Sequence, residues 1–177
     1  MQRRSFLQRL VALTLGGLGF SSCTRSDTVN ATSEPGSAQI TKLDKPLQEW
    51  KKLLLPKAYA VLFEEETERA GSSPLNDEKR DGTFICAACY LPLFESKAKY
   101  ESGTGWPSFY QPIPGRLGQK TDYKLIYPRT EYHCLRCGGH QGHVFDDGPP
   151  PTGQRWCNNG VALNFVPTGE PLPALRT

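Results

Sequence analysis

The chain has 177 residues, enough for one domain with a substantial core and too few for two. Its hydrophobic fraction of 37%, with 15 prolines and 17 glycines, excludes general disorder and favours a globular, loop-rich chain biased toward strands. Three of the 21 basic residues, Arg3, Arg4 and Arg9, lie in the first 22 residues, which hold no acid. The other 18 balance the 18 acidic residues, so the charge argues against a nucleic-acid or anionic-membrane surface.

The first 22 residues are a predicted export signal. They combine a basic start with a mostly apolar run at residues 10–20, which is too short to span a hydrocarbon layer of ~30 Å. The run RRSFL at residues 3–7 resembles a twin-arginine signal, which carries folded proteins across a bacterial membrane. We therefore expect export from a bacterial cytoplasm to the periplasm or an equivalent compartment.

Residues 23–45 are predicted to be a tether. Small and polar residues, with proline and glycine, dominate this stretch, which cannot bury enough apolar surface to fold alone. The run FSSC at residues 20–23 looks like a loose lipoprotein box, with Phe20 in place of the usual leucine. We expect a lipid on Cys23 to be the only membrane attachment. The alternative is an ordinary cleaved signal in which Cys23 is incidental.

Two short amphipathic helices are expected next. Pro46 suits a first helical turn, and Leu47, Trp50, Leu53 and Leu54 recur at helical spacing. Pro56 ends this helix and allows a second one, which carries Tyr59, Leu62 and Phe63. We expect Trp50 to be a core residue.

The remainder of the chain is predicted to be antiparallel β structure. Residues 67–81 form a polar loop, and residues 82–86 read as a strand that runs into a turn. Alternating apolar residues predict two further strands, at residues 123–127 (Tyr123, Leu125, Tyr127) and at residues 161–165 (Val161, Leu163, Phe165). No helical period follows residue 65, and the paired CxxC units are the one internal repeat.

Two CxxC pairs, Cys86 with Cys89 and Cys134 with Cys137, predict one metal site. Each pair allows a turn to direct two sulfurs at one ion, and two such turns complete a tetrahedral shell of four thiolates suited to zinc. A closed shell of this kind is structural and leaves no position for a substrate. Two disulfides are the alternative in an exported protein, and iron uses the same ligands.

Cys157 is left over once the metal site and Cys23 are assigned. Arg155 lies two residues earlier, on the same face if this stretch is a strand, and so favours the thiolate; Asn158 and Asn159 argue against an apolar pocket. A thiolate is the nucleophilic form of cysteine. The alternative is a buried thiol that acts only as a small hydrophobic group.

His140, His143 and Asp147 lie between the second CxxC pair and Cys157. The histidines are read either as two metal ligands or as groups that supply a proton, because the unperturbed pKa of imidazole is ~6.5. Asp147 is read either as part of a turn or as a carboxylate that orients a histidine.

These motifs together resemble the type B peptide-methionine sulfoxide reductases, a family specific for the R epimer of methionine sulfoxide. The resemblance runs from about Pro46 to Val166. It lies in both CxxC pairs and in residues 67–69 (TER), 102–109 (SGTGWPSF), 140–149 (HQGHVFDDGP) and 155–159 (RWCNN). It implies a reductase domain at residues 46–168, with a C-terminal tail at residues 169–177.

The resemblance implies two antiparallel sheets, short N-terminal helices and one structural Zn²⁺ per chain. It makes Cys157 the nucleophile that attacks the sulfoxide sulfur, giving methionine and a sulfenic acid on Cys157. The remaining implied site residues are His140, His143 and Asp147 in the polar half of the pocket, Arg155 and Asn159 beside the thiolate, and Trp106 against the substrate's methyl group. Plain core packing is the alternative for Trp106.

One position departs from the family pattern. Many members carry a resolving cysteine where this chain has Thr104, so the disulfide that those members form with the nucleophile is not available here. The resemblance therefore implies that an external thiol, such as thioredoxin or a small thiol, reduces the Cys157 sulfenic acid. The implied partners are oxidised proteins or peptides and this reductant, and the implied role is protein repair.

Two other classes of function compete with this interpretation. A zinc-ribbon binding module for nucleic acid requires a basic face, whereas the chain without its leader is neutral. An electron-transfer protein with iron on the same cysteines would be coloured, unlike a zinc protein. We expect a monomeric enzyme that binds no nucleic acid.

Overall fold

The computed structural model describes residues 40–177. The predicted export signal, the lipid on Cys23 and most of the tether concern residues outside this range. Among the described residues, no helix combines the length and the apolar character that crossing a membrane requires.

Two short helices precede the sheets, as predicted. Helix α1 covers Leu47–Leu53, and helix α2 covers Pro56–Glu64 with its proline at the first helical position, where a missing N–H costs no hydrogen bond. The proline also disfavours helical geometry at Leu55, which is extended and separates the two helices. Trp50 is 1% exposed and stacks on Phe63 with ring centroids 5.4 Å apart, so it is a core residue.

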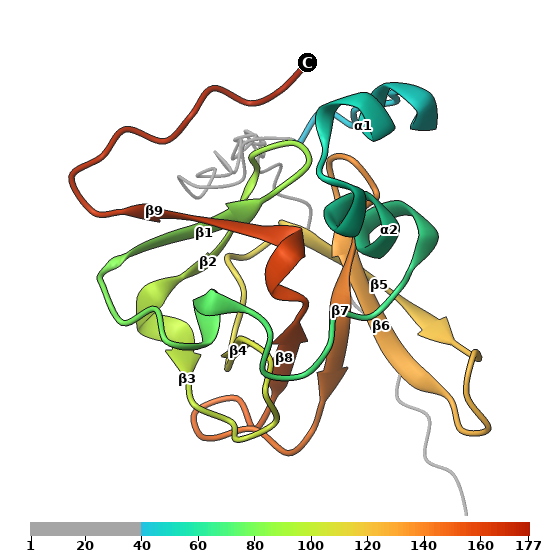
Figure 1. The fold of residues 1–177 in the computed structure, drawn as a ribbon. Helices are drawn as coiled ribbons and strands as arrows, with labels where there is room; N and C mark the ends of the chain where they lie inside the picture. Colours follow the sequence, from blue (N-terminus) through green and yellow to red (C-terminus); the bar gives the residue numbers. More distant parts are fainter. Residues whose placement is uncertain (1–39) are drawn as a thin grey trace, which may run out of the picture. The chain divides into compact units, whose positions relative to one another are not determined.

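Two antiparallel sheets make up the rest of the described chain, which confirms the predicted fold class (Figure 1). The smaller sheet has the order β2-β1-β9, with β1 at Gly82–Cys86, β2 at Pro92–Glu95 and β9 at Leu163–Pro167. The larger sheet has the order β3-β4-β8-β7-β6-β5. Its strands are β3 Lys99–Tyr100, β4 Ser108–Phe109, β5 Leu117–Asp122, β6 Arg129–Cys134, β7 His140–Phe145 and β8 Arg155–Asn158. Short 3-10 helices lie at Pro74–Asn76 (η1), Ser96–Ala98 (η2) and Gly160–Ala162 (η3).

The core lies between the two sheets and consists largely of aromatic side chains. Phe84 of β1 and Phe94 of β2 contact Phe109 of β4, with ring centroids 5.0 and 4.1 Å apart. Tyr132 of β6 and Trp156 of β8 extend the cluster, with centroids 4.9 Å apart. Burying such a side chain contributes ~1.5–3 kcal/mol, so this cluster holds the middle of the larger sheet against the smaller one.

One predicted strand is wrong. Residues 123–127 form bends between β5 and β6, and Tyr123 is 77% exposed. The alternation at Tyr123, Leu125 and Tyr127 was misleading because no neighbouring strand pairs with this segment and no sheet face buries its side chains. The last predicted strand begins two residues later than expected, because Val161 belongs to η3 and only Leu163–Pro167 pair with β1.

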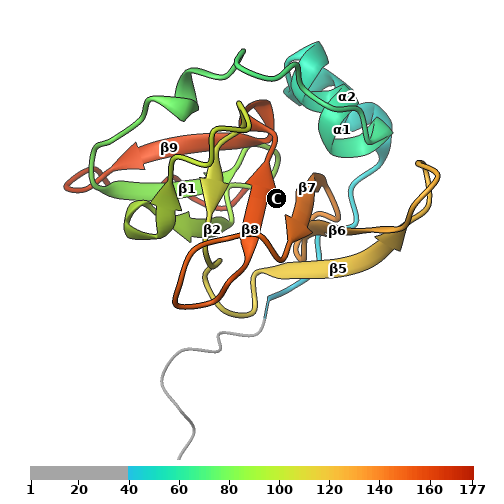
Figure 2. The ribbon, with the colours of Figure 1, turned by 90° about the horizontal axis from the view of Figure 1, so that it is seen from below.

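Strands β7 and β8 occupy the middle of the larger sheet, between the smaller sheet and the β5–β6 hairpin (Figure 2). The register of β8 places Cys157 opposite His143 of β7 on one side and opposite Ser108 of β4 on the other. Cross-strand partners of this kind have Cβ atoms ~4.5–5.5 Å apart. The pairing therefore brings together side chains from three separate motifs of the sequence.

Candidate active site

The four cysteines of the CxxC pairs meet at one point, as predicted. Cys86 and Cys89 flank the turn after β1, and Cys134 and Cys137 flank the turn after β6. Their sulfur atoms all lie within 4.8 Å of one another, with 3.7 Å between Cys86 and Cys137 and 3.5 Å between Cys89 and Cys134. Disulfide sulfurs would be ~2 Å apart, whereas four sulfurs at ~2.3 Å from a central ion lie ~3.8 Å apart.

The chemistry of this donor set fits a thiolate-binding metal. Three of the sulfurs belong to fully buried residues, and burial raises the pKa of the Cys86 thiol well above its usual range. Four thiolates at this separation require a cation to offset their repulsion. Gly138 has φ of +74°, which supplies the turn conformation that a side chain would strain. All four ligand positions are held by cysteines, so the site is closed.

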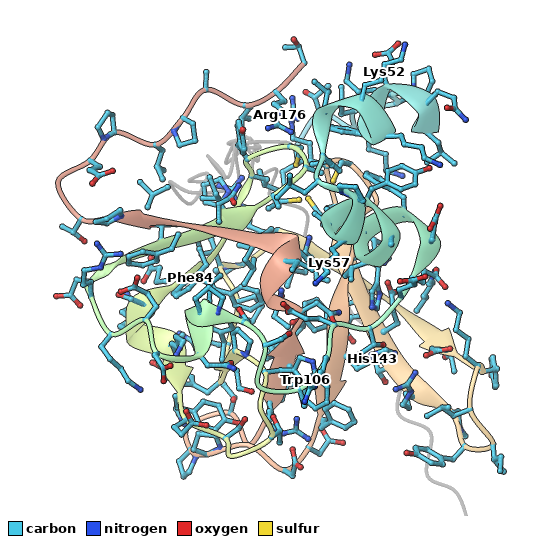
Figure 3. All side chains as sticks on the ribbon, viewed as in Figure 1. Lys52, Lys57, Phe84, Trp106, His143 and Arg176 are labelled. Carbon is cyan, nitrogen blue, oxygen red and sulfur yellow. The ribbon has the colours of Figure 1, made fainter. Side chains whose placement is uncertain are left out.

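Cys157 lies half-buried in a separate small pocket, here called the Cys157 pocket. Its volume is about 100 Å³, and its lining includes Thr67, Trp106, Arg129, His143, Phe145 and Cys157. Figure 3 shows Trp106 and His143 close together in the lower part of the molecule. The lining combines polar side chains, among them His143, Arg129 and Asn159, with the aromatic rings of Trp106 and Phe145.

The resting form of Cys157 is the neutral thiol. Burial raises the pKa of Cys157, while the Arg155 guanidinium and the hydroxyls of Thr104 and Ser108 act in the opposite direction. Arg155 therefore favours the thiolate, as the sequence indicates, but burial has the larger effect on the pKa of Cys157. Ser102 Oγ lies 2.8 Å from both Thr104 Oγ1 and Ser108 Oγ, so these hydroxyls form a chain beside the thiol.

His143 is the histidine that reaches the Cys157 pocket. Its Nε2 lies 2.8 Å from Asp122 Oδ2, and the same carboxylate oxygen accepts a hydrogen bond from Arg129 at 2.6 Å. The Lys124 backbone N–H, His143 and Arg129 keep the pKa of Asp122 low, so the carboxylate is ionised and accepts the Nε2 proton. Burial lowers the pKa of His143, although Asp122 partly offsets it. At neutral pH the imidazole is therefore neutral, with Nδ1 unprotonated.

His140 lies behind His143 and not in the pocket lining. It is 3% exposed, and its ring is 5.4 Å from that of His143. Its Nδ1 lies 2.8 Å from Glu131, which also bonds His133 at 3.2 Å. Burial alone raises the pKa of Glu131, but the two histidines outweigh it and lower the value to about 2. Of the two histidines that the resemblance places in the polar half of the pocket, the lining includes only His143.

Of the two readings of Asp147, as a turn residue or as a carboxylate that orients a histidine, the structure does not support the second, because Asp147 pairs with Arg155. Its carboxylate accepts two hydrogen bonds from Arg155, at 2.7 and 2.9 Å. The guanidinium also lies over the Phe145 ring, 4.2 Å from its centroid. Asp147 and Phe145 together hold Arg155 on the same face of β8 as Cys157. The carboxylate partners of His143 and His140 are Asp122 on β5 and Glu131 on β6, which local spacing does not reveal.

Glu68 connects Trp106 to Asn159. The Glu68 carbonyl accepts a hydrogen bond from Trp106 Nε1 at 2.9 Å, and its N–H donates to Asn159 Oδ1 at 2.9 Å. Its carboxylate accepts from the Gly160 N–H at 2.6 Å. Asn159 is buried and also donates to the Gln141 carbonyl at 3.0 Å. In this structure Asn159 holds the TER segment against β8, which positions the Trp106 ring.

Four further residues, to which no sequence motif assigns a role, belong to this arrangement: Glu68, Asp122, Arg129 and Glu131. Glu68 lies in the TER segment, which is part of the family pattern. Asp122 and Arg129 flank a loop that carries no recognisable motif. Glu131 lies in a strand, where a glutamate is ordinarily exposed, so its residue type does not indicate a role. No local signal distinguishes these three.

The fold and site define a class of protein in which one half-buried cysteine lies in a small pocket, apart from a closed four-cysteine site. The SelR domain family model matches residues 54–167. The peptide methionine sulfoxide reductase MsrB of Pseudomonas entomophila (strain L48) is 50% identical over 131 residues, covering 72% of this chain and 98% of that protein. The MsrB of Methanosarcina barkeri (strain Fusaro / DSM 804) is 51% identical over 124 residues, covering 70% and 87%.

A plant relative extends the comparison. The chloroplastic peptide methionine sulfoxide reductase B1 of Arabidopsis thaliana is 41% identical over 159 residues, covering 89% of this chain and 76% of that protein. This chain therefore belongs to the peptide methionine sulfoxide reductase MsrB family, a family of oxidoreductase enzymes, as its sequence motifs predicted.

Proposed function

We propose that this protein reduces methionine R-sulfoxide in proteins or peptides to methionine, and so repairs proteins after oxidation. The observation that carries the proposal is the position of Cys157, which shares one small pocket with the polar side chain of His143 and the aromatic ring of Trp106. A sulfoxide has the matching polarity, with one basic oxygen and one apolar methyl group on the same sulfur. The R preference rests on the family resemblance.

The first half-reaction reduces the sulfoxide and oxidises Cys157. The Cys157 sulfur attacks the substrate sulfur and forms an S–S bond, and the S–O bond breaks as the protonated oxygen leaves as water. A water molecule then attacks the Cys157 sulfur and breaks the S–S bond, which releases methionine and leaves a sulfenic acid on Cys157. In sum, R₂SO and Cys157–SH give R₂S and Cys157–SOH, so the substrate gains two electrons and the cysteine sulfur loses two. No electron acceptor other than the substrate is required.

His143 is the proposed proton carrier. The resting thiol and imidazole are both neutral, so the thiol proton must move before or during attack. His143 lies opposite Cys157 in the strand register, and Asp122 fixes its Nε2–H, which leaves Nδ1 to take up the proton and pass it to the sulfoxide oxygen. Arg129 lines the same pocket and stabilises charge that develops on this oxygen.

Trp106 and Phe145 form the proposed wall for the methyl group of the substrate. Trp106 is oriented by its Nε1 hydrogen bond to the Glu68 carbonyl, so its face is fixed before substrate arrives. Binding of the substrate would remove the remaining water from the pocket and strengthen its polar contacts. The roles of His140, Arg155 and Asp147 are then to position groups that touch the substrate. Asn159 lines the pocket itself and also orients Trp106 through Glu68.

An external thiol is the proposed reductant of the Cys157 sulfenic acid. One thiol displaces water to form a mixed disulfide with Cys157, and a second thiol releases Cys157 and forms the reductant's disulfide. Thr104 stands beside Cys157, where a resolving cysteine would stand in many relatives. Turnover with thioredoxin should therefore be slower than with a small dithiol, and Thr104→Cys should raise the thioredoxin-driven rate. An unchanged rate would contradict this scheme.

Zinc is the proposed ion at the four cysteines, one per chain. A closed set of four thiolates is typical of structural zinc, which would hold the turns after β1 and β6 together. The ion would take no part in the reaction at Cys157. Measured metal content, with a colourless protein, would distinguish zinc from iron.

We also infer that residues 46–168 are the reductase domain of an exported, monomeric protein. The RRSFL run of the leader supports export, and Cys23 is the proposed lipidation site. Residues 169–177 are the proposed tail after the domain. Fractionation of the producing cells, with an Arg3→Lys, Arg4→Lys double variant as control, would test the export route.

The experiment that tests the function is reduction of the separate R and S epimers of a methionine sulfoxide peptide, with a small dithiol as reductant. Turnover of the R epimer alone establishes both reaction and stereochemistry. Turnover of the S epimer, or of neither epimer by metal-loaded protein, would reject the proposal.

A further inference from the structure

The Cys157 pocket is too small to hold more than one side chain of a polypeptide. Its volume is about 100 Å³, whereas pockets that bind whole small ligands measure ~300–1,000 Å³. If the substrate is an oxidised polypeptide, as proposed above, the residues on either side of the methionine sulfoxide must lie outside this pocket. The surface next to it therefore decides which polypeptides bind well.

Two larger hollows continue from the Cys157 pocket. Thr67 lines both the pocket and a bridging hollow of about 490 Å³, which is also lined by Arg69 and Ser72. The bridging hollow shares Lys57, Glu68, Pro74 and Val161 with an apolar hollow of about 680 Å³. Figure 3 shows Lys57 above Trp106 and His143. Each hollow therefore adjoins the next across shared lining residues, and the row of three is here called the groove.

The far end of this groove is apolar. The apolar hollow is lined mainly by aliphatic and aromatic side chains from the start of α2, η1 and β9: Leu55, Pro56, Ala58, Leu75, Leu163 and Phe165. Leu55 at its rim is 79% exposed. An apolar hollow that adjoins a binding pocket is typical of a site for an apolar group.

We propose that this groove binds the polypeptide around the oxidised methionine, and that the apolar hollow takes a large apolar side chain from the same polypeptide. The occupant follows from continuity, because a chain whose sulfoxide enters the Cys157 pocket passes over Thr67 and Glu68 toward the hollow. It also follows from the substrate's chemistry. Methionine is usually buried among apolar neighbours, and its oxidation disrupts that packing, so oxidised segments expose large apolar residues.

The test uses short peptides with one methionine R-sulfoxide and a leucine at successive positions on either side. One position should lower KM about tenfold relative to the peptide without leucine, with kcat unchanged, because the hollow buries much of one leucine side chain. Leu55→Glu should abolish this preference and leave reduction of free methionine sulfoxide unaltered. Leu53→Glu is the matched control, since Leu53 is 50% exposed on α1 and lies outside the apolar hollow.

Binding of the same peptides to the Cys157→Ser variant, measured by calorimetry, separates this inference from the proposed reaction. A leucine preference in binding supports the groove even if no epimer is reduced. Equal affinity for all peptides would overturn the groove, as would identical behaviour of Leu55→Glu and Leu53→Glu. Reduction of free methionine sulfoxide would in that case still support the proposed reaction.

Discussion

The four cysteines that follow β1 and β6 and the single cysteine on β8 differ in what surrounds the sulfur atom. Each sulfur of the first group lies within 4.8 Å of three others, so the group can saturate one metal ion. Cys157 instead faces hydroxyls, Arg155 and His143 in a pocket with room for one side chain. The same kind of side chain is therefore placed to hold a metal ion in one region and to meet a substrate in the other, and its neighbours make the difference.

Removal of the Cys157 sulfur gives the largest expected contrast between the two regions. Cys157→Ser should lower the rate of sulfoxide reduction by at least ~10⁴-fold, because the nucleophile itself is lost. Metal content and melting temperature should be unchanged, because Cys157 is not one of the four clustered cysteines. The measurements are single-turnover kinetics and thermal unfolding. Retained reduction would show that Cys157 is not the nucleophile.

Loss of one of the four clustered cysteines should instead change the metal content and the melting temperature. Cys134→Ser should release the metal and lower the melting temperature so far that little folded protein remains at 37 °C. The reason is that structural zinc contributes ~10 kcal/mol or more, comparable to the whole stability of a domain. Elemental analysis and circular dichroism, with chelator-treated wild type for comparison, provide the check. If the variant were metal-free and its melting temperature unchanged, the metal would have no structural role.

Replacement of the proton carrier should affect the chemical step alone. His143→Gln should lower kcat by about 100-fold, because general acid–base catalysis contributes ~10²–10⁴-fold. His133→Gln is the matched control, since His133 contacts Glu131 outside the Cys157 pocket and should leave kcat unchanged. Equal effects of the two variants would mean that His143 acts only through packing.

The pH dependence of kcat/KM tests the electrostatics of Cys157. Its pKa is raised, so the thiolate is scarce at neutral pH, and kcat/KM should increase as pH rises through that pKa. Arg155→Gln removes the cation that favours the thiolate, so the profile should move to higher pH, with about a tenfold loss at neutral pH. Arg155→Lys should shift the pH profile less, because lysine keeps the positive charge. If the wild-type and Arg155→Gln profiles had the same midpoint, Arg155 would not affect the pKa of Cys157.

Much of the candidate site was accessible from short-range patterns. The CxxC spacing identified all four clustered cysteines, and proline positions identified both helices, because two residues between thiols and a fixed φ at proline act locally. The prediction of a strand at residues 123–127 is wrong because it also rests on a local pattern alone. Its alternation has meaning only where a sheet face buries one side, and residues 123–127 lie at the tip of a hairpin.

The sequence by itself determined the class of fold, the cysteines that meet and the one cysteine left for chemistry, since these depend on residue type and local spacing. Only the tertiary structure decided that Asp122 and not Asp147 holds His143, that His140 lies outside the pocket, and that burial outweighs Arg155 at Cys157. Each of these depends on strand register and on exclusion of water. Both arise when distant segments pack, so no local pattern encodes them.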